Sequence, residues 1–74
     1  MKNIGQRIIS RRTELNISQT DLARQINESK QTLYKYEKGI ITNIPIENLE
    51  RIAKALEVNP AWLCGWSDRK EDEV

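Results

Sequence analysis

Apolar residues recur at spacings of three and four along nearly the whole chain. No segment sustains the alternation of apolar and polar residues that a half-buried strand needs. Spacing of this kind gives each of several short helices one apolar stripe, so the sequence predicts an all-α fold. Because the chain has only 74 residues, we expect a single domain with a small core, closed by five helices.

Residues that can cap a helix or hold its first turn divide this pattern into five segments. They are Asn3, Ser18, Ser29, Pro45 and Asn59. The first, second and fourth predicted helices cover about residues 4–14, 18–26 and 45–57. The third lies between Ser29 and Gly39, and a short fifth ends before Gly65. Asn27 and Gly39 suit the ends of the second and third helices because Asn and Gly tolerate a left-handed backbone.

The apolar stripes also predict the core. Its expected members are Ile4, Ile8, Leu15, Leu22, Ala23, Ile26, Leu33, Tyr36, Leu49, Ile52, Ala53, Leu56, Trp62 and Leu63. We expect Trp66 to fold back beside Trp62 and Leu63. Cys64 is expected to be a small buried apolar residue rather than a reactive thiol.

The counts of cysteine and histidine exclude most catalytic chemistry. With one cysteine and no histidine, the chain forms no intrachain disulfide, no His/Cys zinc cluster and no Ser–His or Cys–His nucleophilic pair. We therefore expect no catalytic residues, no metal, no cofactor and no small-molecule ligand. A mean hydropathy of −0.69 and a polar N-terminus argue against a membrane span and a signal peptide, which predicts a cytoplasmic protein.

The net charge of +1 conceals a division between the two halves of the chain. Residues 1–38 carry eight basic and four acidic side chains, whereas residues 39–74 carry four basic and seven acidic ones. An excess of positive charge in one half is compatible with a polyanionic partner, and it is also compatible with a simple solvated face.

Residues 18–38 predict a helix-turn-helix, in which two short helices are joined by a tight turn. Ala23 is small enough to let the two helices cross closely, and Asn27 turns the chain between them. Leu33 and Tyr36 would anchor the second helix from beneath. A pair of short helices with this spacing occurs in many helical bundles, so the periodicity alone does not specify a partner.

Four motifs make the chain resemble the Cro and phage-repressor (XRE-like) class of helix-turn-helix DNA-binding domains. They are Ser18-Gln19-x-x-Leu22-Ala23, Tyr36-Glu37-Lys38-Gly39, Leu49-x-x-Ile52-Ala53-x-x-Leu56-x-Val58 and Ala61-Trp62-Leu63-Cys64-Gly65-Trp66. The resemblance covers about residues 3–66 and implies a five-helix, lambda-repressor-like domain that reads an operator as a dimer. We accordingly expect a DNA-binding domain over residues 1–66 and an acidic, disordered tail or hinge stub over residues 67–74.

The chain departs from this class at two places. Asn27 replaces the usual glycine of the turn, which is a mild change because Asn is the next-best residue for a left-handed backbone. The loop after Gly39, often basic in the class, is Ile40-Ile41-Thr42-Asn43 here. That loop therefore offers the phosphate backbone little beyond Asn43.

Helix geometry selects the residues expected to read DNA. Gln31, Tyr34, Lys35 and Lys38 lie on one arc of the third helix, opposite Leu33 and Tyr36. The residues predicted to read base edges are Lys30, Gln31, Thr32 and Lys35, since Gln pairs with adenine and Lys donates to guanine. Those predicted to contact phosphates or to position the helices are Ser18, Gln19, Ser29, Tyr34, Lys38 and Asn43. Gln19 is expected either to contact a phosphate or to orient Gln31.

Arg12 and Glu37 match an ion pair that is common in the resembling repressors. The resemblance implies that this pair is buried and joins the first helix to the end of the third. The alternative is that Arg12 and Glu37 are two surface charges that happen to suit each other.

These observations predict sequence-specific binding of double-stranded DNA by a bacterial transcriptional regulator. We expect a repressor of phage or mobile-element type, acting as a homodimer on a pseudo-palindromic operator and associating with the nucleoid when bound. The dimer surface is expected around Ile40, Ile41, Ile44 and the fifth helix, because apolar loop residues are unfavourable in water. The alternatives are a protein-interaction module, such as an antitoxin or anti-repressor, and, more remotely, an enzyme.

Overall fold

A computed structural model of the protein describes residues 3–67, and all regular secondary structure in that range is helical. The five helices are α1 (Ile4–Glu14), α2 (Gln19–Gln25), α3 (Lys30–Glu37), α4 (Ile46–Ala55) and α5 (Pro60–Leu63). The predicted all-α fold of five helices is confirmed. The residues beyond Ser67, which hold most of the predicted acidic tail, lie outside the described range.

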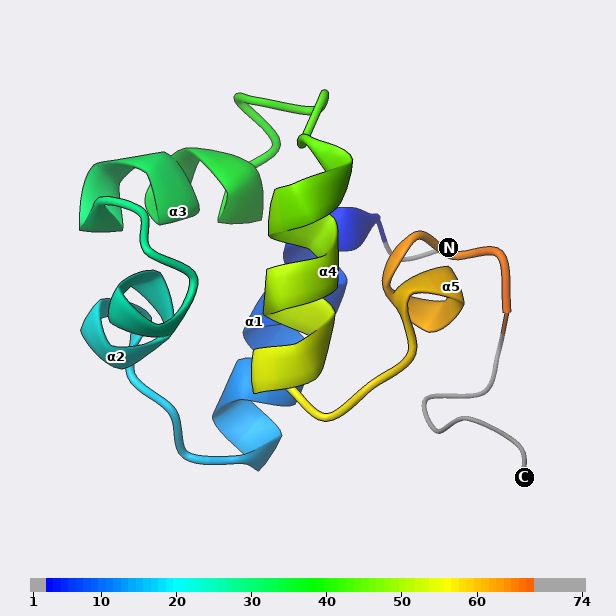
Figure 1. Cartoon of the computed structure of the whole chain (residues 1–74), viewed down its shortest axis with the longest axis horizontal. Helices are drawn as coiled ribbons and strands as arrows, with labels where there is room; N and C mark the ends of the chain where they lie inside the picture. Colours follow the sequence, from blue (N-terminus) through cyan, green and yellow to red (C-terminus); the bar gives the residue numbers. More distant parts are fainter. Residues whose placement is uncertain (1–2, 68–74) are drawn as a thin grey trace.

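The helices surround one core, with α4 in front of α1 in the view of Figure 1. The pair α2 and α3 lies to one side of α4, and α5 lies to the other side. In this arrangement α3 packs against α1 and α2, whereas α4 packs against α2 and α5. The helix-turn-helix therefore rests on the long helices of the domain.

Four of the five helices are capped by the side chains that the sequence indicates. The side-chain oxygens of Asn3, Ser18, Ser29 and Asn59 accept hydrogen bonds from backbone amides in the first turns of α1, α2, α3 and α5. Pro45 holds the N-cap position of α4 without a side-chain bond. Because a cap residue is not itself helical, α2 and α4 are shorter at both ends than the predicted ranges 18–26 and 45–57.

The predicted core is formed, with one error at its end. Ile8, Leu22, Leu33, Leu56 and Leu63 are fully buried, and the other stripe residues are buried or packed against them. Trp66 does not fold back beside Trp62, since 84% of its surface is exposed. Gly65 turns the chain away with a φ of 83°, and the guanidinium of Arg7 lies 4.8 Å from the centre of the Trp62 ring. Cys64 is half-buried at the edge of the core.

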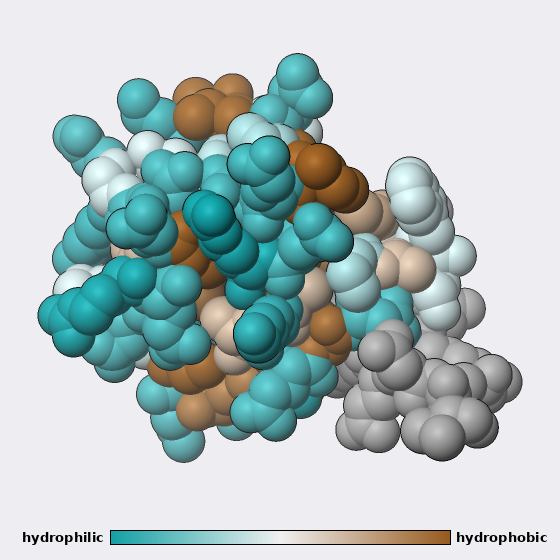
Figure 2. Space-filling view, viewed as in Figure 1, coloured by the Kyte–Doolittle hydropathy of each residue, from teal (hydrophilic) through white to brown (hydrophobic). Residues whose placement is uncertain are grey.

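In the loop between α3 and α4, the exposed isoleucines are not all those predicted for the dimer surface. Ile44 is buried and Ile41 is half-buried against the core, so the loop exposes less apolar surface than the prediction assumes. The exposed isoleucines are Ile40 and Ile46, which are 63% and 66% exposed and flank the loop. On the face shown in Figure 2, hydrophobic side chains form small separate patches in a mostly hydrophilic surface.

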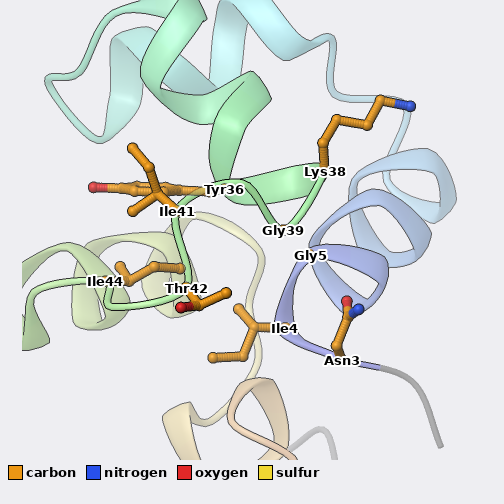
Figure 3. A pocket seen from close by; sticks show the side chains of 9 residues that line it. All are labelled: Asn3, Ile4, Gly5, Tyr36, Lys38, Gly39, Ile41, Thr42 and Ile44. Carbon is orange, nitrogen blue, oxygen red and sulfur yellow. The ribbon is translucent and has the colours of Figure 1, made fainter.

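The same loop and the start of α1 enclose an open hollow of about 310 Å³. Its walls include Ile4, Ile41, Ile44 and the backbone of Gly5 and Gly39. Within residues 3–67, Lys38 is the one charged residue that lines it, and its side chain points away in Figure 3. No charged side chain of this described range is therefore aimed into the hollow.

None of the helices in residues 3–67 has both the length and the apolar character that crossing a bilayer requires.

Candidate nucleic-acid interface

The turn between α2 and α3 is closed by its backbone. Asn27 has a φ of 60°, the left-handed conformation predicted for it. The amide of Glu28 then donates to the carbonyl of Ala23 at 2.9 Å, which bonds the turn back onto α2. Leu22, Ala23 and Leu33 are buried at the crossing of the two helices. The angle between α2 and α3 is thus set by a bonded turn and by packing.

The eight residues of α3 divide into an inner and an outer face. The inner face consists of Leu33, Tyr36 and Glu37, all of which are buried. The outer face carries the exposed side chains of Lys30, Gln31, Tyr34 and Lys35, and Lys38 follows at the helix end. This is the arrangement that the helical spacing predicts for these residues.

The outer-face side chains have few partners within residues 3–67. Lys30, Gln31 and Lys35 take part in no ion pair or side-chain hydrogen bond there. The ammonium of Lys38 lies 5.8 Å from the centre of the Tyr34 ring, in reach of a weak cation–π attraction. Three cations and an amide are consequently displayed to solvent beside one aromatic ring.

Ser18, Ser29 and Thr32 are already engaged at helix starts. The Oγ of Ser18 accepts from the amide of Asp21 at 3.0 Å. The Oγ of Ser29 accepts from the amide of Thr32 at 3.0 Å and donates to its Oγ1 at 2.9 Å. Thr32 is half-buried, and its γ-methyl group takes no part in these bonds. Asn43 is exposed in the loop that precedes α4.

Glu37 is the centre of a polar cluster beneath the end of α3. Its Oε2 accepts from Arg12 Nε at 2.9 Å, and its Oε1 accepts from Arg12 Nη2 at 3.3 Å. The amide of Gln19 donates to the same Oε1 at 2.9 Å, so in this structure Gln19 is bonded to Glu37 rather than to Gln31. Since a carboxylate at the C-terminal end of a helix opposes the helix dipole, the Arg12 guanidinium compensates an otherwise unfavourable position.

The ion pair of Arg12 and Glu37 is largely shielded from water. The side chains of the two residues are 18% and 3% exposed, and Arg12 Nη1 also donates to the carbonyl of Ile17 at 3.1 Å. The alternative of two surface charges does not describe this geometry. α1, the start of α2 and the end of α3 are joined by one bidentate carboxylate.

Sequence reasoning missed two residues that hold α3 in place. A Cβ atom on Gly5 would collide with the carbonyl oxygens of Tyr36 and Glu37, so α1 approaches the end of α3 closely only because residue 5 lacks a side chain. Asn48 is 94% buried in α4 and donates to Glu28 and Tyr36. A glycine in the first turn of a helix is a visible signal, whereas nothing local marks Asn48.

The sequence model of the helix-turn-helix family matches residues 8–63, which include α2, the turn and α3. The chain belongs to the helix-turn-helix family. It is 42% identical over 60 residues to y4wC, an uncharacterised helix-turn-helix-type transcriptional regulator of Sinorhizobium fredii, covering 81% of this chain and 41% of y4wC. It is 36% identical over 73 residues to the cryptic phage CTXphi transcriptional repressor RstR of Vibrio cholerae, covering 96% of this chain and 63% of RstR.

A solved structure of the same type agrees with the fold. The P22 c2 repressor, crystallised with a synthetic operator, superposes with a TM-score of 0.83 at 28% identity, covering 90% of this chain and all of that one. These matches confirm the resemblance to the Cro and phage-repressor type. The matched proteins are themselves transcriptional regulators and repressors. The chain spans less than two thirds of the length of the curated relatives it matches.

Proposed function

We propose that the domain, over residues 1–66, binds double-stranded DNA sequence-specifically by placing the outer face of α3 in the major groove. The observation that carries this proposal is the set of exposed, unpartnered side chains on Lys30, Gln31 and Lys35. They stand on a helix whose inner face is buried, so the helix backbone that carries them is fixed before DNA arrives. Only the side chains then remain to be ordered on binding, which limits the loss of conformational entropy.

The proposed roles follow the exposure of each side chain. Gln31 would pair with an adenine edge, Lys30 and Lys35 would donate to guanine, and the Thr32 methyl would touch a thymine. Lys38, Tyr34 and Asn43 would contact phosphates. Because Ser18, Gln19 and Ser29 already bond within the protein, we assign them to positioning the helices.

We propose that two copies act together on a pseudo-palindromic operator, since one small module binds a half-site weakly. Of the surface first predicted for pairing, Ile40 remains exposed, and Ile46 joins it at the other end of the loop. An Ile40→Glu, Ile46→Glu variant should sediment as a monomer at concentrations where the unmodified chain pairs. Unchanged sedimentation would contradict this surface.

We further propose repression by occupation of an operator that overlaps a promoter, in a regulator of phage or mobile-element type. The support is the similarity to RstR, a phage repressor, and to the P22 c2 repressor, which was crystallised with an operator. A protein acting this way works in the bacterial cytoplasm and associates with the nucleoid when bound.

The test is selection of binding sites from a random duplex library, followed by titration of the winning site at several salt concentrations. We expect a two-fold symmetric site with half-sites about 10 base pairs apart and a steep fall of affinity with salt. Enrichment of no sequence, even with two copies joined by a linker, would reject sequence-specific binding and favour the protein-interaction alternative.

A further inference from the structure

The buried side-chain amide of Asn48 bonds to one residue just before α3 and to another in the last turn of α3. The Nδ2 of Asn48, in the first turn of α4, donates one hydrogen to Glu28 Oε2 at 2.7 Å and the other to the Tyr36 hydroxyl oxygen at 3.0 Å. Glu28 immediately precedes Ser29, the N-cap of α3, and Tyr36 lies in the last turn of the same helix. Long side chains in a helix generally lean back toward its start, which agrees with one nitrogen reaching both groups.

This bridge links two helices that otherwise share little surface. α3 packs mainly against α1 and α2, and α4 mainly against α2 and α5. Asn48 is only 6% exposed and Tyr36 only 4%, so their hydrogen bond is formed away from water. A buried polar group without its partner is unfavourable, so breaking the bridge should weaken the link between α3 and α4.

The charge at the bridge is also unusual for a surface that faces DNA. Glu28 is an acidic residue in the turn directly before the basic outer face of α3. Its carboxylate is half-buried and held by the Asn48 amide on the α4 side, which directs it toward the protein. Without that bond, the carboxylate would be free to turn toward solvent, where it would repel phosphates.

We infer that Asn48 is a positioning residue for DNA recognition: by holding Glu28 and Tyr36 from α4, it keeps α3 at one angle and keeps the Glu28 carboxylate away from the DNA. The part of this inference that concerns DNA rests on the proposed function. The part that concerns α3 holds for the free protein and is measured there.

The experiment exchanges the two groups of the bridge. Asn48→Asp places two carboxylates against each other, Glu28→Gln removes the acid, and Glu28→Gln with Asn48→Asp restores one amide and one carboxylate at the original net charge. Asn48→Leu removes both hydrogen bonds at similar side-chain size, in case two facing carboxylates prevent folding. Gln25→Glu, on the exposed end of α2, adds the same charge as Asn48→Asp without touching the bridge.

Amide hydrogen exchange in the free protein measures how firmly the Asn48 bridge holds α3. We expect the Leu33 amide and its neighbours in α3 to exchange at least about tenfold faster in Asn48→Asp and Asn48→Leu. Exchange in α1 should change less, and Gln25→Glu should leave α3 unchanged. The double exchange variant should return α3 toward the unmodified rate. Equal acceleration in every helix, or no acceleration in α3, would overturn the inference.

DNA binding provides the second readout. Loss of positioning should weaken binding to the selected site by about tenfold beyond any weakening of non-specific duplex binding, which reports the repulsion of phosphates by an added or released carboxylate. Equal weakening of both kinds of binding would show that Asn48 has no positioning role. If the unmodified chain selects no site, the proposed function fails. The amide hydrogen exchange rates of the free protein still decide whether the Asn48 bridge holds α3 in place.

Discussion

The two faces of α3 differ in how completely their side chains are partnered within the protein. On the inner face, Glu37 alone receives three hydrogen bonds from Arg12 and Gln19, and Leu33 is fully buried. On the outer face, Gln31 and Lys35 have no partner within residues 3–67. One short helix thus combines a face committed to stability with a face left free for recognition.

Because of this difference, substitutions on the two faces of α3 should have different effects. Changes on the inner face should lower the free energy of unfolding, because they leave buried groups without partners or force atoms together. Changes on the outer face should leave stability intact and alter DNA binding alone. Each prediction below challenges that separation.

The largest expected effect is the loss of stability in Arg12→Met. This variant keeps an apolar side chain at position 12 but leaves the Gln19 amide as the remaining hydrogen-bond donor to the Glu37 carboxylate in this cluster. Breaking a buried pair from one side costs about 3–5 kcal/mol, which urea unfolding would measure. The double variant Arg12→Met, Glu37→Met should lose less, since no charge is then buried alone. A loss below about 1 kcal/mol in the single variant would mean that the pair behaves as a surface pair.

Gly5→Ala should have the next largest effect. The added methyl would collide with the carbonyl oxygens of Tyr36 and Glu37, which are backbone atoms that cannot rotate away. Overpacking of this kind costs about 1–3 kcal/mol and should be visible as a lower thermal midpoint.

Gly65→Ala is the matched control for that substitution. Gly65 has a φ of 83° but open space around it, so alanine there meets only backbone strain of about 1–2 kcal/mol. The two variants compare a steric collision between α1 and α3 with backbone strain at a position that has open space around it. If Gly5→Ala is the milder of the two, α1 can shift away from α3, and the close approach is not required.

Much of the inner face could be predicted from the sequence because its signals are local. Leu33 and Tyr36 follow from helical spacing, and Asn27 and Gly39 are read from the residue types that tolerate a positive φ. The pair of Arg12 and Glu37, by contrast, was implied by resemblance to a family. It spans 25 residues of sequence, and periodicity does not indicate such a partnership.

Ile44 and Asn48 have the opposite character, since each depends on where distant segments meet, whereas Trp66 depends on its neighbour Gly65. Ile44 was expected on the surface because it stands in a loop, yet the loop folds inward and buries it. Trp66 was expected inside because it is large and apolar, yet Gly65 turns the chain outward. Asn48 looks like a solvent-facing residue of an amphipathic helix until Glu28 and Tyr36 are placed beside it.

The smallest expected effect on stability belongs to Gln31→Ala on the outer face. Because the Gln31 side chain is exposed and unpartnered, its removal should change the free energy of unfolding by no more than about 0.5 kcal/mol. Affinity for the selected operator should nevertheless fall by about 1–3 kcal/mol, with relaxed preference at one base position, as measured by titration against single-base variants of the site.

Lys38→Ala separates base reading from phosphate contact. Its ammonium lies over Tyr34 at the end of α3, so its loss should weaken binding to every sequence alike and reduce the salt slope by about one unit. A Gln31→Ala variant that behaved like Lys38→Ala would show that Gln31 reads no base. If both variants bound and repressed as well as the unmodified chain, the outer face would not be the recognition surface, and an exposed, unpartnered helix face would then have to serve a protein partner.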